Sequence, residues 1–168
     1  MAAVRIIILM GVSGCGKSVL GETLGTKLGL KFIEGDEFHT SVNRKKMGSG
    51  IPLNDQDRLS WLTKLGDLAS TSTHSLIMSC SALKKSYRHL LGAKGANLIF
   101  VHLHAHREVI EQRIKSRKGH FFDPGLLTSQ FETLEPLDSE EQGFQVNVAN
   151  PLHLILAEII SRLDDWIK

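Results

Sequence analysis

The sequence predicts an α/β fold in which helices cover both faces of a five-stranded parallel sheet. Short apolar, β-branched runs alternate with longer segments of helical periodicity, as in consecutive βαβ units. A glycine-rich phosphate-binding motif at residues 11–18 joins the first such run to the first helical segment. The chain has 168 residues, of which 42% are hydrophobic, so we expect one sizeable core and a single domain over residues 1–168.

The expected strands are mostly apolar, as strands covered on both faces are. They span residues 5–10, 31–35, 75–80, 97–102 and 144–148. The expected helices lie between and after them, at residues 17–28, 57–69, 83–91, 108–118 and 152–167. Gly29 follows the first helix where a left-handed glycine ends a helix. Asn54 and Asp57 predict a capping box at the start of the second helix.

Two polar segments, residues 40–53 and 119–138, contain several glycines and prolines and show little sustained periodicity. Segments of this kind commonly carry function on a rigid scaffold. We expect the first to belong to an acceptor-binding segment of about residues 36–58. We expect the second to form a lid.

Charge and cysteine content exclude several classes of protein. Lys and Arg number 20 against 18 Asp and Glu, so no strong field favours a nucleic-acid or membrane partner. Cys15 and Cys80 do not suggest a disulfide framework, and we expect free thiols in a reducing compartment. The apolar run at residues 6–10 is too short to span a bilayer. We therefore expect a cytoplasmic protein with neither a nucleic-acid nor a membrane partner.

The phosphate-binding motif reads Gly11-Val12-Ser13-Gly14-Cys15-Gly16-Lys17-Ser18, in its required place between a strand and a helix. We assign residues 11–19, ending at Val19, to the binding of ATP. Lys17 is expected to reach the β- and γ-phosphates, and the Ser18 hydroxyl to hold Mg²⁺. A glycine-rich turn that binds nothing would need neither side chain. We interpret Cys15 as a small filler rather than a nucleophile, because phosphoryl transfer needs no covalent step.

A candidate acceptor site follows the second and third strands. Asp36 stands at the carboxyl end of a parallel strand, where open α/β folds bind ligands, and could take the proton of an attacking hydroxyl. The alternative for Asp36 is an exposed loop acid or a helix cap. The third strand ends without the Asp of many P-loop ATPases and GTPases, which argues against a motor or switch. Lys84 and Lys85 instead offer cations for an anionic acceptor.

Further candidates are cationic or imidazole side chains. Arg58 and Arg44, the latter beside two lysines, could bind a substrate carboxylate, although each could also be an ordinary surface residue. Arg113 and Arg117 lie four apart on one helical face before the proposed lid, where they could contact transferred phosphate or simply complement the helix dipole. Histidines at 39 and 120 fall in loops near the site, and no His/Cys spacing of a zinc centre is present.

Taken together, the motifs resemble those of the gluconokinase family over most of the chain and in the right order. The matching segments are GVSGCGKS at 11–18, GDEFH at 35–39, NRKKM at 43–47, GIPLNDQDR at 50–58, CSALKK at 80–85, GHF at 119–121 and SQFETLE at 129–135. The resemblance implies a nucleoside-kinase-like P-loop fold and Mg²⁺-dependent transfer of the ATP γ-phosphoryl group to the 6-hydroxyl of gluconate, in gluconate catabolism. It also implies a homodimer.

By the same resemblance, Asp36 orients or deprotonates the acceptor hydroxyl, Lys17 and Arg117 take part in catalysis, and Arg113 and Arg117 contact ATP. The residues implied to contact the acceptor are Asp36, His39, Arg44, Arg58, Lys84, His120 and Gln130. Gluconate carries a carboxylate and many hydroxyls, which agrees with such a polar and cationic set. Glu34 departs from the family, whose members often have Asp there. If that acid contacts Mg²⁺ through a water molecule, the longer side chain would move the contact; if it does not, the change is neutral.

Two other functions remain open from the sequence. A shikimate-type kinase would share Lys17, Asp36 and an anionic acceptor, but it would call for a glycine-rich turn where this chain has Ser-Ala-Leu-Lys at 81–84. A nucleotide- or RNA-binding module without catalytic activity would call for exposed aromatic residues. Most of the aromatic residues here fall within expected strands or helices.

Overall fold

The computed structural model describes residues 4–116 and 123–167. Its centre is a five-stranded parallel sheet with the strand order β2-β3-β1-β4-β5. The strands are β1 (Ile6–Met10), β2 (Lys31–Glu34), β3 (Leu76–Ser79), β4 (Leu98–His104) and β5 (Gly143–Asn147). All five strands expected from the sequence are confirmed, with ends that differ by one or two residues.

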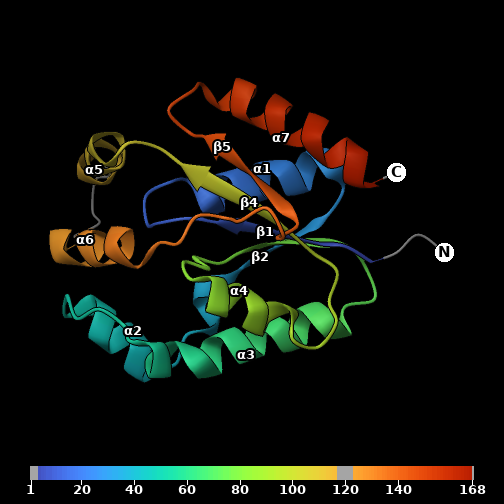
Figure 1. Cartoon of the computed structure of the whole chain (residues 1–168). Coiled ribbons are helices and arrows are strands. Elements are labelled where there is room, and N and C mark those ends of the chain that lie inside the picture. The colour runs from blue at the N-terminus through green and yellow to red at the C-terminus, as the bar shows by residue number, and fades with distance from the viewer. Residues whose placement is uncertain (1–3, 117–122, 168) are drawn as a thin grey trace.

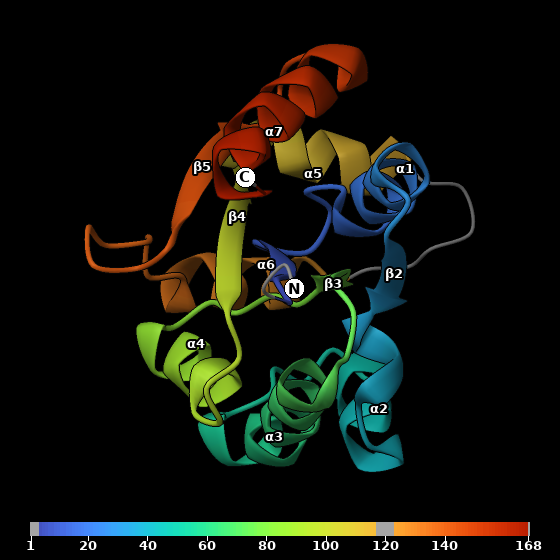
Figure 2. The same cartoon turned by 90° about the vertical axis from the view of Figure 1, so that its right-hand side faces the viewer.

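Helices form a layer on each face of the sheet (Figures 1 and 2). They are α1 (Lys17–Leu28), α2 (Ser41–Gly48), α3 (Asp55–Thr71), α4 (Lys85–Gly92), α5 (Arg107–Ser116), α6 (Pro124–Thr133) and α7 (Leu152–Ile167), with a short 3-10 helix η1 (Gly35–Phe38) after β2. In Figure 1, α1 and α7 lie above the sheet and α3 and α4 below it. None of the described helices is long and apolar enough to cross a membrane.

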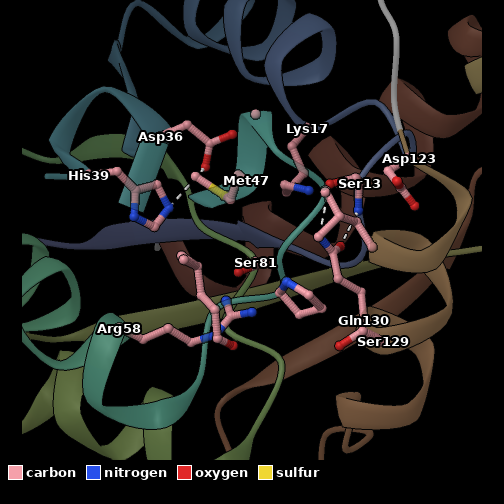
Figure 3. Close-up of a pocket in the computed structure, with 15 residues that line it drawn as sticks. Ser13, Lys17, Asp36, His39, Met47, Arg58, Ser81, Asp123, Ser129 and Gln130 are labelled. Atoms are coloured by element: carbon pink, nitrogen blue, oxygen red, sulfur yellow. Dashed lines mark hydrogen bonds and ion pairs between the residues drawn. The ribbon is translucent and has the colours of Figure 1, made fainter. Parts of the chain in front are cut away.

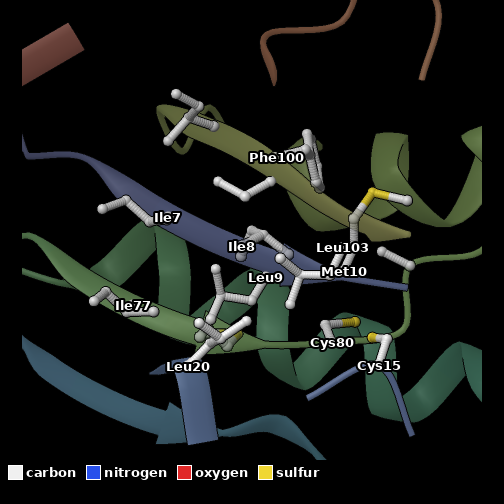
Figure 4. Close-up of a cluster of buried hydrophobic side chains, with 14 of the residues drawn as sticks. Ile7, Ile8, Leu9, Met10, Cys15, Leu20, Ile77, Cys80, Phe100 and Leu103 are labelled. Carbon is white, nitrogen blue, oxygen red and sulfur yellow. The ribbon is translucent and has the colours of Figure 1, made fainter. Parts of the chain in front are cut away.

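Strand β1 is buried along its whole length because β3 and β4 flank it and helices cover both faces. Figure 4 shows Ile7, Ile8 and Leu9 of this strand within the apolar core. Cys15 and Cys80 belong to the same core and are unpaired. Burial raises the pKa of Cys80 to about 12, so this thiol is not a nucleophile at neutral pH.

Local capping signals in the sequence are confirmed. Gly29 ends α1 in the left-handed conformation, with φ of 66°. The Asn54 side chain accepts from the Asp57 N–H, and the Asp57 carboxylate accepts from the Asn54 N–H, which completes the expected capping box at α3. These interactions satisfy N–H groups that would otherwise have no partner at a helix start.

The two segments expected to lack periodicity each contain a helix, which is a correction to the sequence interpretation. In α2, the Thr40 hydroxyl accepts from the Asn43 N–H. In α6, Asp123 caps the first turn and Pro124 occupies its first position. The helices have eight and ten residues, which is too short for a clear repeat of apolar residues. Their capping residues are therefore the better sequence signal.

A buried ion pair attaches α4 to the segment before β5. Arg88 and Glu141 have side chains that are 1% and 7% exposed, and Arg88 Nη2 lies 2.9 Å from Glu141 Oε2. Arg88 also donates to the backbone carbonyls of Ala82 and Glu135 at 3.0 and 3.1 Å. Burial by itself would raise the pKa of Glu141, but the Arg88 hydrogen bond holds that pKa below its ordinary value.

We expect Arg88→Met to lower the free energy of unfolding by about 3–5 kcal/mol, because Glu141 would remain buried without its counterion. The double variant Arg88→Met/Glu141→Leu should recover most of that loss. The stabilisation should be present at neutral pH and lost as pH falls through the lowered pKa of Glu141. Urea unfolding at pH 7 and pH 4 measures both effects, and equal stability of wild type and Arg88→Met would contradict the assignment.

Candidate active site

The carboxyl ends of the strands meet a pocket between the phosphate loop (residues 11–18), η1, the start of α3, and α6. Figure 3 shows the labelled side chains of Lys17, Asp36, His39, Arg58 and Gln130 around it. Parallel strands place their following loops at one edge of the sheet, which is where open α/β folds bind ligands. We call this the central pocket.

The phosphate loop is shaped by glycines at positions where the backbone requires them. Gly11 and Gly14 have φ of 136° and 82°. A Cβ atom on Gly11 would lie 2.5 Å from the Leu103 carbonyl oxygen, and one on Gly14 would lie 2.6 Å from Ile114. Lys17 Nζ donates to the carbonyls of Gly11 and Val12 at 2.9 and 3.0 Å. The ammonium group is thereby held over the loop, beside the place for a phosphate.

Glu34 lies between the phosphate loop and β3. Its carboxylate accepts hydrogen bonds from the hydroxyls of Ser18 and Ser79, one at each oxygen. The longer acid noted in the sequence therefore reaches the hydroxyl that phosphate loops use for Mg²⁺. Hydroxyl and carboxylate oxygens are the hard ligands that Mg²⁺ prefers, so this donor set fits the ion.

Asp36 is held at the pocket by the 3-10 turn η1. The Gly35 N–H donates to the Ser79 hydroxyl at 2.9 Å, and Trp61 Nε1 donates to the Gly35 carbonyl at 2.8 Å. The Asp36 side chain lines the pocket and is only partly buried, with 69% of its surface exposed. That partial burial raises the pKa of Asp36, with Glu34 adding to the effect and Lys17 and Arg58 opposing it.

His39 is almost fully buried, with 5% of its surface exposed. Its ring stacks on Trp61 at a centroid distance of 4.0 Å, and its Nε2 lies 3.9 Å from Asp36 Oδ1. Burial, with smaller contributions from Arg58 and Arg44, lowers the pKa of His39 to about 4. The ring is therefore neutral at pH 7 and can both donate and accept a hydrogen bond.

We expect the His39 ring to stay neutral down to about pH 5, which nitrogen chemical shifts of labelled histidine would report. A short histidine-containing peptide in the same buffer is the control, because its ring titrates near the ordinary histidine value of about 6.5. Because the folded pKa lies below the unfolded one, His39 should also reduce stability as pH falls from about 6.5 towards 4. A midpoint near 6.5 for His39 would contradict the burial argument.

Arg58 occupies the opposite side of the pocket from Lys17 in the view of Figure 3. It is 8% exposed, its Nε donates to the Leu53 carbonyl at 3.4 Å, and its guanidinium lies 5.6 Å from the centre of the Tyr87 ring. A guanidinium has five N–H donors, so donors remain to bind an anion in the pocket.

Helix α6 forms the remaining wall. Gln130 accepts from the Ser13 N–H at 2.7 Å and donates to the Ser13 hydroxyl at 3.0 Å. Asp123 also lines the pocket, and a Cβ atom on Gly50 would lie 2.6 Å from its Oδ2. The sequence analysis missed Asp123, for which an Asp directly before a Pro at a helix start was the available signal.

Some predicted acceptor residues are not brought into the pocket. Lys84 pairs with Asp55, with Nζ–Oδ distances of 2.8 and 3.1 Å, and lines a neighbouring hollow with Tyr87. Arg44 is exposed, and its Nη1 donates to the Glu37 carbonyl at 3.3 Å. Arg117 and His120 lie outside the described residues.

A second hollow lies beside the phosphate loop, between it and the start of α7. Gly14, Cys15, Gly16, Val19 and Arg113 line it together with Asn150 and Leu152. Arg113 donates to the Val148 carbonyl there. The apolar side chains of Val19 and Leu152 are 49% and 45% exposed, as expected for a surface that a flat ring could cover.

Comparisons with known proteins agree with this geometry. The family model of shikimate kinase matches residues 13–143. A probable gluconokinase of Rattus norvegicus is 40% identical over 94% of this chain and 97% of its own length. The thermoresistant gluconokinase of Escherichia coli K12 is 46% identical over 93% of this chain and 91% of its own length.

The structural comparison gives the same result. The crystal structure of a gluconokinase from Sinorhizobium meliloti 1021 has a TM-score of 0.90 and 41% identity, covering 99% of this chain and 95% of that one. High identity over nearly the whole length of all three proteins confirms the resemblance read from the motifs. The chain therefore belongs to the gluconokinase family of P-loop kinases.

Proposed function

We propose that this chain transfers the γ-phosphoryl group of ATP to the 6-hydroxyl of D-gluconate, giving 6-phospho-D-gluconate and ADP. The observation that carries the proposal is a single pocket that holds Lys17 of the phosphate loop, the Asp36 carboxylate and the buried Arg58 guanidinium. Membership of the gluconokinase family indicates gluconate as the acceptor that this pocket binds. A sugar acid needs a cation for its carboxylate and neutral polar groups for its hydroxyls, and Arg58 and His39 offer both.

ATP would bind with its phosphates on residues 11–18 and its nucleoside in the hollow lined by Val19 and Arg113. Ser18 and Glu34 would hold Mg²⁺, directly or through water. When bound, Mg²⁺ neutralises charge on the phosphate oxygens. Lys17 would stabilise the charge that develops on the transferred group, and we assign Arg117 the same task.

The acceptor would place its carboxylate at Arg58 and its 6-hydroxyl at Asp36. The raised pKa of Asp36 suits a group that takes up a proton during the transfer. His39 would bind hydroxyl groups. Gln130, which the family resemblance also assigns to the acceptor, has only one N–H and one oxygen lone pair left by Ser13 for such a contact. Arg44, Lys84 and His120 keep their assignment as acceptor residues, for which Lys84 would have to leave its ion pair with Asp55.

The lid expected over residues 119–138, with α6 (Pro124–Thr133) as its fixed wall, would exclude water from the pocket and limit wasteful hydrolysis of ATP. We therefore infer slow ATP hydrolysis without gluconate. Similar rates of hydrolysis with and without gluconate would refute this part. From the family resemblance we also infer a cytoplasmic homodimer built from one domain per chain, acting on a small molecule rather than on nucleic acid or a membrane.

The decisive experiment measures ADP production from Mg-ATP with gluconate, shikimate, glucose or no acceptor. Turnover with gluconate alone would establish the proposed reaction. Turnover with shikimate would show that the protein is a kinase but that its acceptor is shikimate rather than gluconate. A folded protein that binds ATP but shows no acceptor-dependent turnover would be a nucleotide-binding module instead.

A further inference from the structure

Helix α6 and the phosphate loop are joined through one side chain. The carboxamide of Gln130 uses both its ends on Ser13, accepting from the backbone N–H at 2.7 Å and donating to the hydroxyl at 3.0 Å. The two residues are 117 positions apart in the chain. Figure 3 shows these bonds as dashed lines at the edge of the central pocket, beside Lys17.

These bonds use half of the hydrogen-bonding capacity of the Gln130 carboxamide. A carboxamide has two N–H donors and two oxygen lone pairs, and Ser13 takes one of each. Ser13, by contrast, is the third residue of the phosphate loop, where backbone N–H groups turn toward bound phosphate. Gln130 therefore influences the phosphate loop more directly than it influences the acceptor.

The helix that carries Gln130 is itself firmly placed. Leu126 and Leu127 are 8% and 2% exposed, and Leu127 belongs to the main core. At the start of the helix, Asp123 approaches Gly50 of the acceptor-binding segment. A rigid helix thus contacts the acceptor side at Asp123 and the phosphate loop at Gln130.

We propose that Gln130 is a positioning residue that sets the place of the phosphate-loop tip at Ser13, and so aligns the γ-phosphoryl group with the acceptor side of the pocket. This assignment replaces a direct acceptor contact as the main role of Gln130. The alignment of the γ-phosphoryl group with the acceptor rests on the proposed function, whereas the effect of Gln130 on the phosphate loop does not. A misplacement of reacting groups by a fraction of an ångström is enough to slow transfer.

The test compares Gln130→Ala with Glu132→Ala, a matched truncation at an exposed position of the same helix. We expect Gln130→Ala to lower kcat about tenfold and to weaken binding of a fluorescent ATP analogue measured without acceptor. The KM for gluconate should change much less. Glu132→Ala should leave all three values near wild type.

A double-mutant cycle asks whether Gln130 acts through Ser13. Ser13→Ala removes the hydroxyl and keeps the backbone N–H, so it should lower kcat less than Gln130→Ala does. In the Gln130→Ala background, Ser13→Ala should lower kcat little further, because the effects of substitutions at two interacting residues are not additive. Fully additive losses would overturn the proposal.

Two other outcomes would also overturn it: a rise in the KM for gluconate alone, which marks a direct acceptor contact, or values equal to those of Glu132→Ala. If Gln130→Ala does not fold, Gln130→Met keeps the length of the side chain without its polar ends and serves the same comparison. Nucleotide binding is measured without gluconate, so a wild type that fails to phosphorylate gluconate would refute the proposed function and leave this inference testable.

Discussion

Replacement of Lys17 by Ala is expected to lower kcat by about 10²- to 10³-fold, the effect of removing one preorganised donor from a charged transition state. In the structure the ammonium is held at 2.9 and 3.0 Å from two carbonyls of the phosphate loop. It therefore needs no large rearrangement to meet the phosphates of ATP. Coupled measurement of ADP release gives kcat, and binding of an ATP analogue should weaken at the same time.

Lys27→Ala is the matched control for Lys17, since Lys27 is an exposed lysine on the same helix. Its kcat and thermal midpoint should equal those of wild type. Lys17→Ala should keep the wild-type midpoint within a few degrees, because no buried partner charge is left behind. Retained turnover in a folded Lys17→Ala protein would show that the Lys17 ammonium does not stabilise the transition state.

Asp36→Asn is expected to lower kcat by about 10²- to 10⁴-fold, the usual contribution of a general base. The amide has the same shape but cannot take up the proton of the acceptor hydroxyl. Binding of ATP should change little. Glu37→Gln, the neighbouring exposed acid in η1, is the control and should retain wild-type turnover.

The pH profile provides a second test of Asp36. A general base works when it is deprotonated, so the rate should fall as pH drops through the raised pKa of Asp36. The acid limb of the profile should therefore lie above the ordinary range of an aspartate, and it should be absent from the residual activity of Asp36→Asn. A variant that keeps kcat but has a higher KM for gluconate would show that Asp36 orients the acceptor without taking its proton.

Much of the fold was predictable because its signals are local. The order of strands and helices follows from runs of apolar residues, and the phosphate loop follows from glycines and a lysine within eight positions. The end of α1 at Gly29 and the capping box of Asn54 and Asp57 depend on neighbours no more than four residues away. The short helices α2 and α6 were missed because they have little room for an apolar repeat.

The site was only partly predictable, because partners distant in sequence decide where its side chains lie. Lys84 is held outside the central pocket by Asp55, which is 29 residues away. Asp123 enters the pocket from a helix that was expected to be an irregular lid. Gln130 faces Ser13 across 117 residues, so its role at the phosphate loop could not be read from either segment alone.

The sequence by itself determined the α/β class, the phosphate loop with Lys17 and Ser18, and the family, since each depends on residue types at short fixed spacings. The tertiary structure alone decided the strand order β2-β3-β1-β4-β5, the neutral state of buried His39, and which cations reach the pocket. Burial and pairing are properties of surfaces brought together by folding. A side chain acquires its pKa and its partners only when those surfaces meet.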